Sequence, residues 1–187
     1  MMHVFGGGQE VEILRDCRAI IIPDGSATEL KKASRAYITQ VLGGMFTVET
    51  ENGYLVRIDG LDADALGQPV PAERKTKEQL ASDGKSLEEM VWAQLRTCYD
   101  PEIPVNIVDL GLIYDCKVLS EQEDHRAEVQ MTLTAPGCGM GEVLKGDIEQ
   151  KLLDVPGIKS AHVEIVFDPA WESSMMSEAA RLQLGMM

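Results

Sequence analysis

The sequence is poor in aromatic residues, in histidine and in closely spaced cysteines. Only nine of its 187 residues are aromatic (three Phe, two Trp and four Tyr), although hydrophobic residues make up 44% of the chain and suffice for a globular core. The three histidines fall outside any zinc-finger spacing, and no Cys-x-x-Cys pair occurs among the four cysteines, which are Cys17, Cys98, Cys116 and Cys138. A preassembled four-ligand metal site within one chain is therefore not predicted.

Basic residues and long apolar runs are also scarce. The chain has 17 basic against 31 acidic residues, a formal net charge of −14, which argues against binding to nucleic acid or to an anionic membrane surface. No stretch approaches the roughly 20 apolar residues of a membrane span. The first eight residues lack the basic and apolar regions of a secretory signal. We therefore expect a cytoplasmic protein with reduced thiols.

The first part of the chain is predicted to be a small all-β module over residues 1–67. Residues 10–66 are predicted to form short strands, and Asn52-Gly53 is a strong hairpin signal between two of them. The pattern favours a β-barrel or a β-sandwich-like module. Residues 68–85 are rich in proline and charge and are predicted to be a linker, in which Leu80 hints at a helical turn.

The second part, residues 86–171, has the pattern α-β-β-α-β. Ser86 and Glu89 form a capping box at the start of a helix that is predicted to end at Asp100-Pro101. Predicted strands at 113–119 and 127–134 precede a helix at 140–152 and a strand at 161–167. The fold class is therefore α+β: a two-layer domain, with a three-stranded sheet covered on one face by two helices, follows a small all-β module.

The strongest candidate for chemistry is a single cysteine in a glycine-rich loop. Cys138 lies between Gly137 and Gly139, after a strand that Pro136 breaks and before a helix that begins near Gly141. The glycines leave the sulfur sterically open, and the free N–H groups at the start of the helix favour a thiolate. The alternative is a small residue packed in a tight turn.

A second candidate is the acidic, proline-containing loop over residues 100–111. Asp100, Glu102 and Asp109 lie in it, and its residues follow neither helical nor strand periodicity. Loops of this length in compact domains are often functional. The carboxylates either supply oxygen ligands or position a partner, or else Asp100 caps a turn and Glu102 is solvated. In an α-β-β-α-β layout this loop and the cysteine loop can meet at one end of the sheet.

The other cysteines and the tail have plainer interpretations. Cys98 lies on the apolar face of the first helix and Cys116 alternates in phase with strand residues, so both are predicted to be buried, and Cys17 is given no role. Trp171 precedes a methionine-rich tail over residues 172–187 and either covers the core or stacks near the loop cysteine. The methionines suit a variable protein contact, but packing of a terminal helix is the favoured interpretation.

Three stretches together resemble a known family. They are similar to the iron-sulfur cluster assembly domain of the SufT and PaaD type, and that domain match covers about residues 86–171. The β-rich extension is similar to the one found in bacterial members of the SufT type. The stretches that carry the resemblance are Asp100–Tyr114, Thr132–Gly141 and Phe167–Trp171.

The resemblance implies a fold related to the C-terminal domain of NifU and an accessory role in iron-sulfur protein maturation. It makes Cys138 the functional thiol and Asp100 and Glu102 motif positions. The paired prolines often found before the tail tryptophan are reduced here to Pro169-Ala170.

Three functions remain open. The first is a non-catalytic maturation factor, with assembly proteins and client apoproteins as partners and a transient iron-sulfur cluster or iron as cargo. Thiolate is a soft ligand suited to such clusters, but one cysteine requires a subunit-bridging cluster in a homodimer, a partner, small thiols, or oxygen ligands from Asp100 or Glu102. The second is a metal-free adaptor. The third is a thiol enzyme with Cys138 as nucleophile, against which stands the lack of a histidine in the motif loops.

Overall fold

The computed structural model describes residues 8–100, 103–121, 124–137 and 139–186. The chain divides into two compact units, Met1–Arg74 and Lys75–Met187, and each unit has a hydrophobic core of its own. The division falls inside the segment predicted as a linker. Among the described helices, none is both long and apolar enough to cross a membrane.

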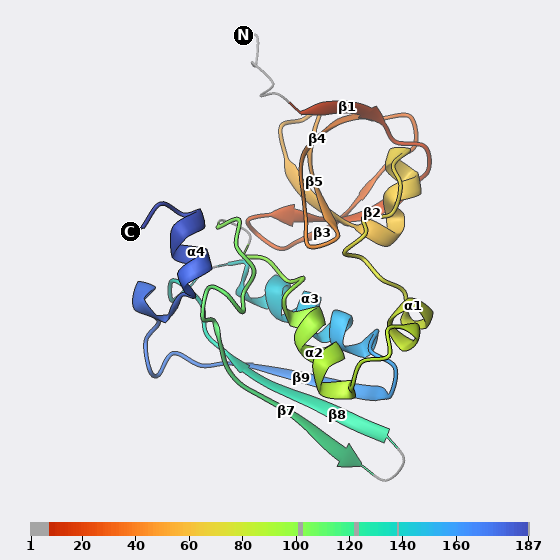
Figure 1. Ribbon diagram of the computed structural model, residues 1–187. Helices are drawn as coiled ribbons and strands as arrows, with labels where there is room; N and C mark the ends of the chain where they lie inside the picture. The colour runs from red at the N-terminus through yellow and green to blue at the C-terminus, as the bar shows by residue number, and fades with distance from the viewer. Residues whose placement is uncertain (1–7, 101–102, 122–123, 138, 187) are drawn as a thin grey trace. The chain divides into compact units, whose positions relative to one another are not determined.

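Unit 1 is built on one curved antiparallel sheet (Figure 1), not on the two packed sheets of a sandwich. In the described part of the chain its strand order is β1-β4-β5-β6-β2-β3. Strand β3 and the helical turn η1 were not predicted from the sequence. The strands are β1 (Gln9–Glu12), β2 (Cys17–Ile22), β3 (Ala27–Leu30), β4 (Arg35–Leu42), β5 (Met45–Thr50) and β6 (Leu55–Asp59).

Alternation of side chains explains how this sheet encloses its core. Phe46 and Val48 on β5, and Val56 and Ile58 on β6, are at most 3% exposed, while their sequence neighbours lie on the other face. The hairpin predicted between β5 and β6 is confirmed, and Gly53 adopts the positive φ of 78° that its turn requires.

The last part of unit 1, residues 60–74, is held against the end of β6 by Asp59. The prediction of short strands through residue 66 is wrong for Gly60–Leu66, which form the 3-10 helix η1. The carboxylate of Asp59 caps η1 by accepting a 2.8 Å hydrogen bond from the amide of Leu61. The same carboxylate pairs with the buried guanidinium of Arg74 through Nε and Nη2, at 2.9 and 3.1 Å. Residues up to Arg74 are therefore tied to the β module.

Unit 2 begins with two short capped helices. Helix α1 (Lys77–Ser82) starts at a Thr76–Gln79 capping box and buries Leu80, inside the predicted linker. The predicted Ser86–Glu89 capping box of α2 (Leu87–Leu95) is confirmed. The predicted end of this helix at residue 100 is wrong.

Helix α2 stops at Leu95 because the following residues turn away from the helix axis. The hydroxyl and the amide of Thr97 both donate to the carbonyl of Gln94, and Tyr99 then forms a strand-like bridge with Asn106. This early stop draws the following loop across the end of the sheet.

The predicted α-β-β-α-β order is confirmed in unit 2. Strands β7 (Ile113–Glu121) and β8 (Asp124–Met131) are antiparallel, and β9 (Ile158–Ile165) follows α3 (Gly141–Leu153) and joins β8 in parallel. Figure 1 shows α2 and α3 on the same side of this sheet. Their apolar side chains pack on the inward residues of β8 and β9 in one core. The likeness to the C-terminal domain of NifU stays a prediction.

A side chain covers part of the edge of this sheet, and two short helical elements follow its last strand. On β9, the amide of Val163 donates a 3.0 Å hydrogen bond to Oε1 of Glu149 on α3. After β9, the chain forms the 3-10 turn η2 (Ser173–Met175) and helix α4 (Glu178–Gln183), which Ser177 caps.

Candidate functional site

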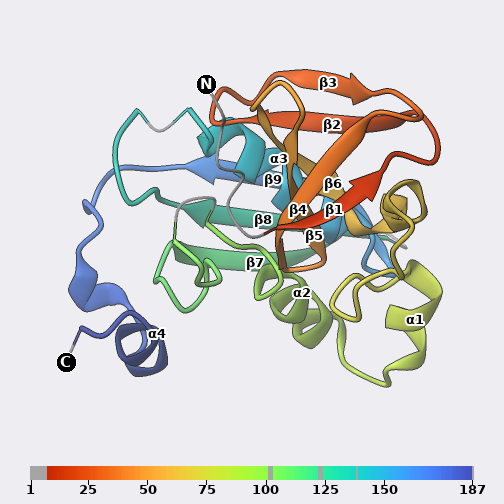
Figure 2. The ribbon, with the colours of Figure 1, turned by 90° about the horizontal axis from the view of Figure 1, so that it is seen from above.

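The three motif segments meet at one end of the three-stranded sheet. The amide of Thr132, just after β8, donates a 2.8 Å hydrogen bond to the carbonyl of Leu112, just before β7. On the other side of β8, the amide of Val166 donates a 2.8 Å hydrogen bond to the carbonyl of Met131. Figure 2 shows the loop before β7, the loop after β8 and the segment after β9 at this same end. The predicted convergence of the two loops is thus present in the backbone.

Asn106 organises the loop that precedes β7. Its Oδ1 accepts hydrogen bonds from the amides of Val108 and Asp109 at 3.1 and 2.9 Å, and its Nδ2 donates to Oδ2 of Asp109 at 2.6 Å. This is the Asx-type turn that asparagine favours. Sequence reasoning missed Asn106, although an asparagine three residues before an aspartate is a recognisable turn signal. The carboxylate of Asp109 therefore has a structural partner inside its own loop.

Asp100 has the turn-capping contact that was one of its two interpretations. Its Oδ1 accepts a 2.9 Å hydrogen bond from the amide of Ile103, and the residue is only 9% exposed. A role of Asp100 as an oxygen ligand stays a prediction. Glu102 lies outside the described residues, and its role as a ligand stays a prediction as well.

The glycine-rich loop after β8 has an exposed tip and a buried base. Pro136, Gly137 and Gly139 are exposed, and Gly137 has a φ of 77°, which only glycine adopts at little cost. Gly141 is buried at the start of α3, where a Cβ atom would come within 2.7 Å of Leu133 Cδ1. Cys138 lies outside the described residues, so its role as the functional thiol stays a prediction.

Two features beside the loop leave polar groups available to a ligand. Met140 precedes α3 without a side-chain hydrogen bond to the first turn, so the N–H groups of that turn are not capped by its side chain. Thr132 is 1% exposed, and among the described residues its Oγ1 has no hydrogen-bond partner. Sequence reasoning treated Thr132 as a strand residue, and no pattern in the sequence marks its hydroxyl.

The C-terminal segment is fastened over the loop that precedes β7. The indole N–H of Trp171 donates a 2.8 Å hydrogen bond to the carbonyl of Leu110, and the indole packs against the core. The amide of Ser177 donates to the carbonyl of Asp109 at 2.8 Å. Gly111, with a φ of 72°, leaves room for the tail, because a Cβ atom there would lie 2.3 Å from the carbonyl oxygen of Met175.

Packing of the terminal helix, the favoured interpretation of the tail, agrees with this arrangement. Met176 and Ala180 are buried in the core of unit 2, and Gln183 Nε2 donates to the carbonyl of Pro104 at 2.9 Å. Met186, in contrast, is 47% exposed.

The described cysteines are placed as small core residues. Cys98 is 3% exposed, as predicted. Cys116, which was also predicted to be buried, is only half-buried against the core. Burial nevertheless raises the pKa of its thiol from 9.0 to about 11, helped by the nearby carboxylates of Asp115 and Glu88. Such a thiol is protonated near neutral pH and is a poor metal ligand.

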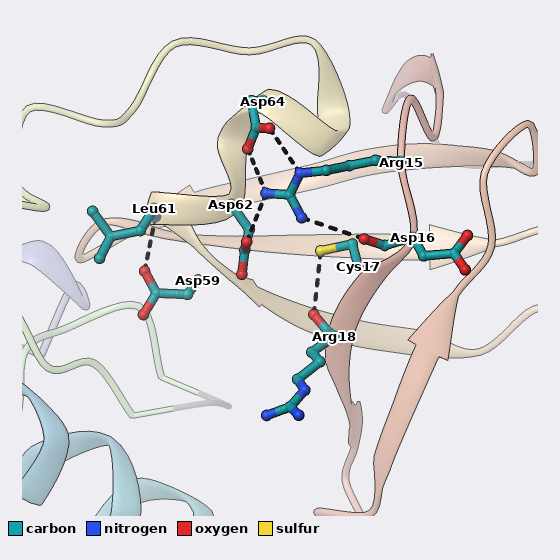
Figure 3. A network of polar contacts seen from close by, with 8 residues as sticks. All are labelled: Arg15, Asp16, Cys17, Arg18, Asp59, Leu61, Asp62 and Asp64. Carbon is teal, nitrogen blue, oxygen red and sulfur yellow. Dashed lines mark hydrogen bonds and ion pairs between the residues drawn. The ribbon is translucent and has the colours of Figure 1, made fainter.

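Cys17 lies in unit 1 beside a polar network at the start of β2 (Figure 3). Its sulfur is 3.3 Å from the carbonyl oxygen of Arg18, and burial raises the pKa of its thiol to about 11. In the same network Arg15 pairs with Asp62 at 2.7 Å and with Asp64 at 2.6 Å. These groups are satisfied by one another.

Metal-ligating side chains do not cluster in the part of the chain that the structure describes. Across these ranges no group of three or more His, Cys, Asp or Glu residues is arranged to hold a metal ion.

Unit 2 is thus an α+β domain whose motif loops gather at one end of a three-stranded sheet. Comparison of its sequence with known families identifies the class of protein. The model of the iron-sulfur cluster assembly protein family matches residues 88–165, which run from α2 through β9. The chain belongs to this family, because it covers 90% of a 46% identical relative from Porphyromonas gingivalis, an Fe-S protein maturation auxiliary factor, over 98 residues or 52% of the chain.

Two further relatives carry the same description. The Fe-S protein maturation auxiliary factor YitW of Bacillus subtilis is 36% identical over 101 residues, which cover 54% of this chain and 96% of YitW. The Fe-S protein maturation auxiliary factor SufT of Staphylococcus aureus is 38% identical over 86 residues, or 46% of this chain and 94% of SufT. The predicted family is therefore confirmed, and each of these alignments spans about half of the chain.

Proposed function

We propose that the protein is a non-catalytic accessory factor in iron-sulfur cluster assembly or transfer, and that Cys138 holds iron or a labile cluster as cargo. The observation that carries the proposal is the family match over residues 88–165, which includes both motif loops. Relatives that this chain covers almost completely are described as Fe-S protein maturation auxiliary factors.

Placement of the other thiols supports the choice of Cys138. Cys17 and Cys98 are at most 3% exposed, and the raised pKa values of Cys17 and Cys116, about 11 each, keep those two sulfurs protonated near neutral pH. The exposed glycines on both sides of Cys138 favour an accessible sulfur at that position. A soft sulfur ligand for iron is thus best sought in this loop.

One cysteine leaves most coordination positions of a cluster to other molecules. A second copy of the chain, a partner protein or a small thiol has to supply the remaining ligands. Asp100, which lies in the first motif segment and caps the turn at Ile103, is a further candidate source of an oxygen ligand. Incomplete ligation of this kind makes a bound cluster labile, which suits transfer to a client more than storage.

Anaerobic reconstitution with iron and sulfide tests the proposal. The full chain is expected to develop sulfur-to-iron charge-transfer absorption, and Cys138→Ser to lose it. Cys116→Ser, at a half-buried thiol outside the motif, is the matched control and is expected to keep it. Mass measurement under non-denaturing conditions then shows whether the iron bridges two chains.

Each other outcome contradicts a distinct part of the proposal. A colourless wild-type protein excludes cargo binding and favours the adaptor. Absorption that persists in Cys138→Ser excludes that residue as the ligand. Stoichiometric alkylation of Cys138 that tracks turnover of a substrate, without bound iron, would instead identify a thiol enzyme.

A further inference from the structure

Unit 1 contains a cavity for which the proposed function has no use. Its volume is about 460 Å³, and it opens at the end of the curved sheet where β3 lies next to the start of β4. Ile21, Leu30 and Val56 form part of its apolar lining. Ala36, the first inward-facing residue of β4, also lines it. Its small side chain leaves the cavity open, whereas the next inward-facing residue, Ile38, is large. Cavities of this size hold a small ligand or a side chain of a bound peptide.

The strand beside the cavity has a free edge. Among the described strands, β3 pairs with β2 alone, and Figure 2 shows it at the border of the sheet. The amide of Ile21 donates a 2.8 Å hydrogen bond to the carbonyl of Ser26. Because hydrogen-bonded and non-bonded pairs alternate in an antiparallel ladder, Thr28 directs its backbone groups toward β2, whereas Ala27 and Glu29 direct theirs outward. Those outward groups are positioned to pair with an added strand.

The ion pairs at the border of the cavity contain more carboxylates than cations. Lys31 and Arg35 both line it, and each is paired with two carboxylates. Two cations are therefore paired with four carboxylates, of which Glu29 and Glu51 also line the cavity. The carboxylates are those of Asp16 and Glu29 around Lys31, and of Glu10 and Glu51 around Arg35. A basic partner complements this border.

We propose that unit 1 binds an extended peptide with alternating aliphatic and basic residues, which adds as a strand to the free edge of β3. Side chains of an added strand alternate between the two faces of the sheet. The aliphatic side chains of the peptide face the same side of the sheet as Thr28 and Leu30, and one of them enters the cavity. The basic set faces outward, where Glu29 is a cross-strand neighbour of opposite charge.

The test uses the full chain and a fluorescein-labelled Lys-Val-Lys-Val-Lys-Val peptide, with binding followed by fluorescence anisotropy. A Lys-Ser-Lys-Ser-Lys-Ser peptide of the same charge is the control for non-specific attraction. The wild-type protein is expected to bind the valine peptide at least about tenfold more tightly, because only that peptide fills the cavity. Hydrogen exchange at the amides of Ala27 and Glu29 is expected to slow when the peptide is bound.

Two substitutions, each with its own control, test the pairing at the edge of β3 and the filling of the cavity separately. Glu29→Pro removes the outward N–H of β3 while the ladder to β2 remains, and Glu29→Gln removes the charge alone. Ala36→Leu fills the cavity, with Val41→Leu at the exposed end of the same strand as its control. Glu29→Pro and Ala36→Leu are expected to weaken binding about tenfold and the two controls less than about threefold, with folding checked by thermal unfolding.

Three results would overturn the inference: no binding to the wild-type protein, equal binding of both peptides, or equal affinity in all four variants. Cys138→Ser is expected to bind the peptide like the wild type, so a failure of this inference is distinguishable from a failure of the cluster proposal.

Discussion

The indole nitrogen of Trp171 lies 2.8 Å from the carbonyl oxygen of Leu110, and this hydrogen bond joins the last motif segment to the first. The two residues are 61 positions apart in the sequence, so the bond closes a long stretch of unit 2. It also explains why a tryptophan, and not another large apolar residue, suits this position.

Trp171→Phe is expected to lower the free energy of unfolding of unit 2 by about 1 kcal/mol, because it removes the N–H donor and keeps most of the apolar area. Chemical denaturation followed by circular dichroism measures this. Trp92→Phe is the control, since the guanidinium of Arg96 lies over the ring of Trp92 and, among the described residues, the indole N–H of Trp92 makes no hydrogen bond. An equal loss in both variants would contradict the assignment.

Gly137→Ala is expected to destabilise the protein by about 1 kcal/mol, because a φ of 77° is strained for any residue with a Cβ atom. Gly146→Ala, inside α3 with open space around it, is the matched substitution and is expected to stabilise by about 0.5 to 1 kcal/mol. Thermal unfolding of the two variants should therefore give shifts of opposite sign. Shifts of the same sign would show that the turn at Gly137 is not the conformation the loop needs.

Arg74→Met is expected to destabilise unit 1 by about 2 to 4 kcal/mol, because it leaves the carboxylate of Asp59 without its buried partner. The guanidinium side chain is only 3% exposed, which limits screening by water. Arg15→Met breaks an arginine–aspartate pair of similar length whose side chains are 44% and 37% exposed, and little measurable change is expected there. Urea denaturation of unit 1 compares the two, and similar losses would show that burial is not the deciding factor.

The stability that Cys17 contributes is expected to fall at high pH. Burial raises the pKa of its thiol to about 11 from an ordinary value of 9.0, so the folded state retains the proton more strongly than the unfolded chain. The resulting stabilisation is complete below pH 9 and is lost as the pH rises through 11. Denaturation of the wild type and of Cys17→Ala at several pH values should show their difference in stability shrinking over this window. A difference that stays constant would contradict the raised pKa.

Local signals in the sequence were sufficient for the order of the elements from α2 to β9 and for the hairpin turn in unit 1. The Ser86–Glu89 capping box, the Asn52-Gly53 turn and the spacing of apolar residues at four-residue intervals in α3 each depend on neighbouring residues. The end of α2 was missed because it depends on the bridge between Tyr99 and Asn106, which no periodicity reveals. Strand β3 was missed for a similar reason, since its four residues have one paired side and a weak alternation.

Only part of the candidate site could be anticipated. The meeting of the two loops followed from the α-β-β-α-β topology, because the start of β7 and the end of β8 must share one end of the sheet. The partners of Asn106, Thr132 and Trp171 did not follow, since each depends on the three-dimensional path of a loop. Residue type alone does not distinguish a turn-capping aspartate such as Asp100 from a ligand.

The carboxylate of Glu149 has a consequence for how two of these chains can associate. Because it occupies the amide of Val163, a strand from another molecule cannot pair continuously along β9 without first displacing a side chain of α3. This protects a polar backbone edge from uncontrolled stacking of molecules into fibrils. A pair of chains that shares cargo would then be expected to meet through a surface other than the edge of β9.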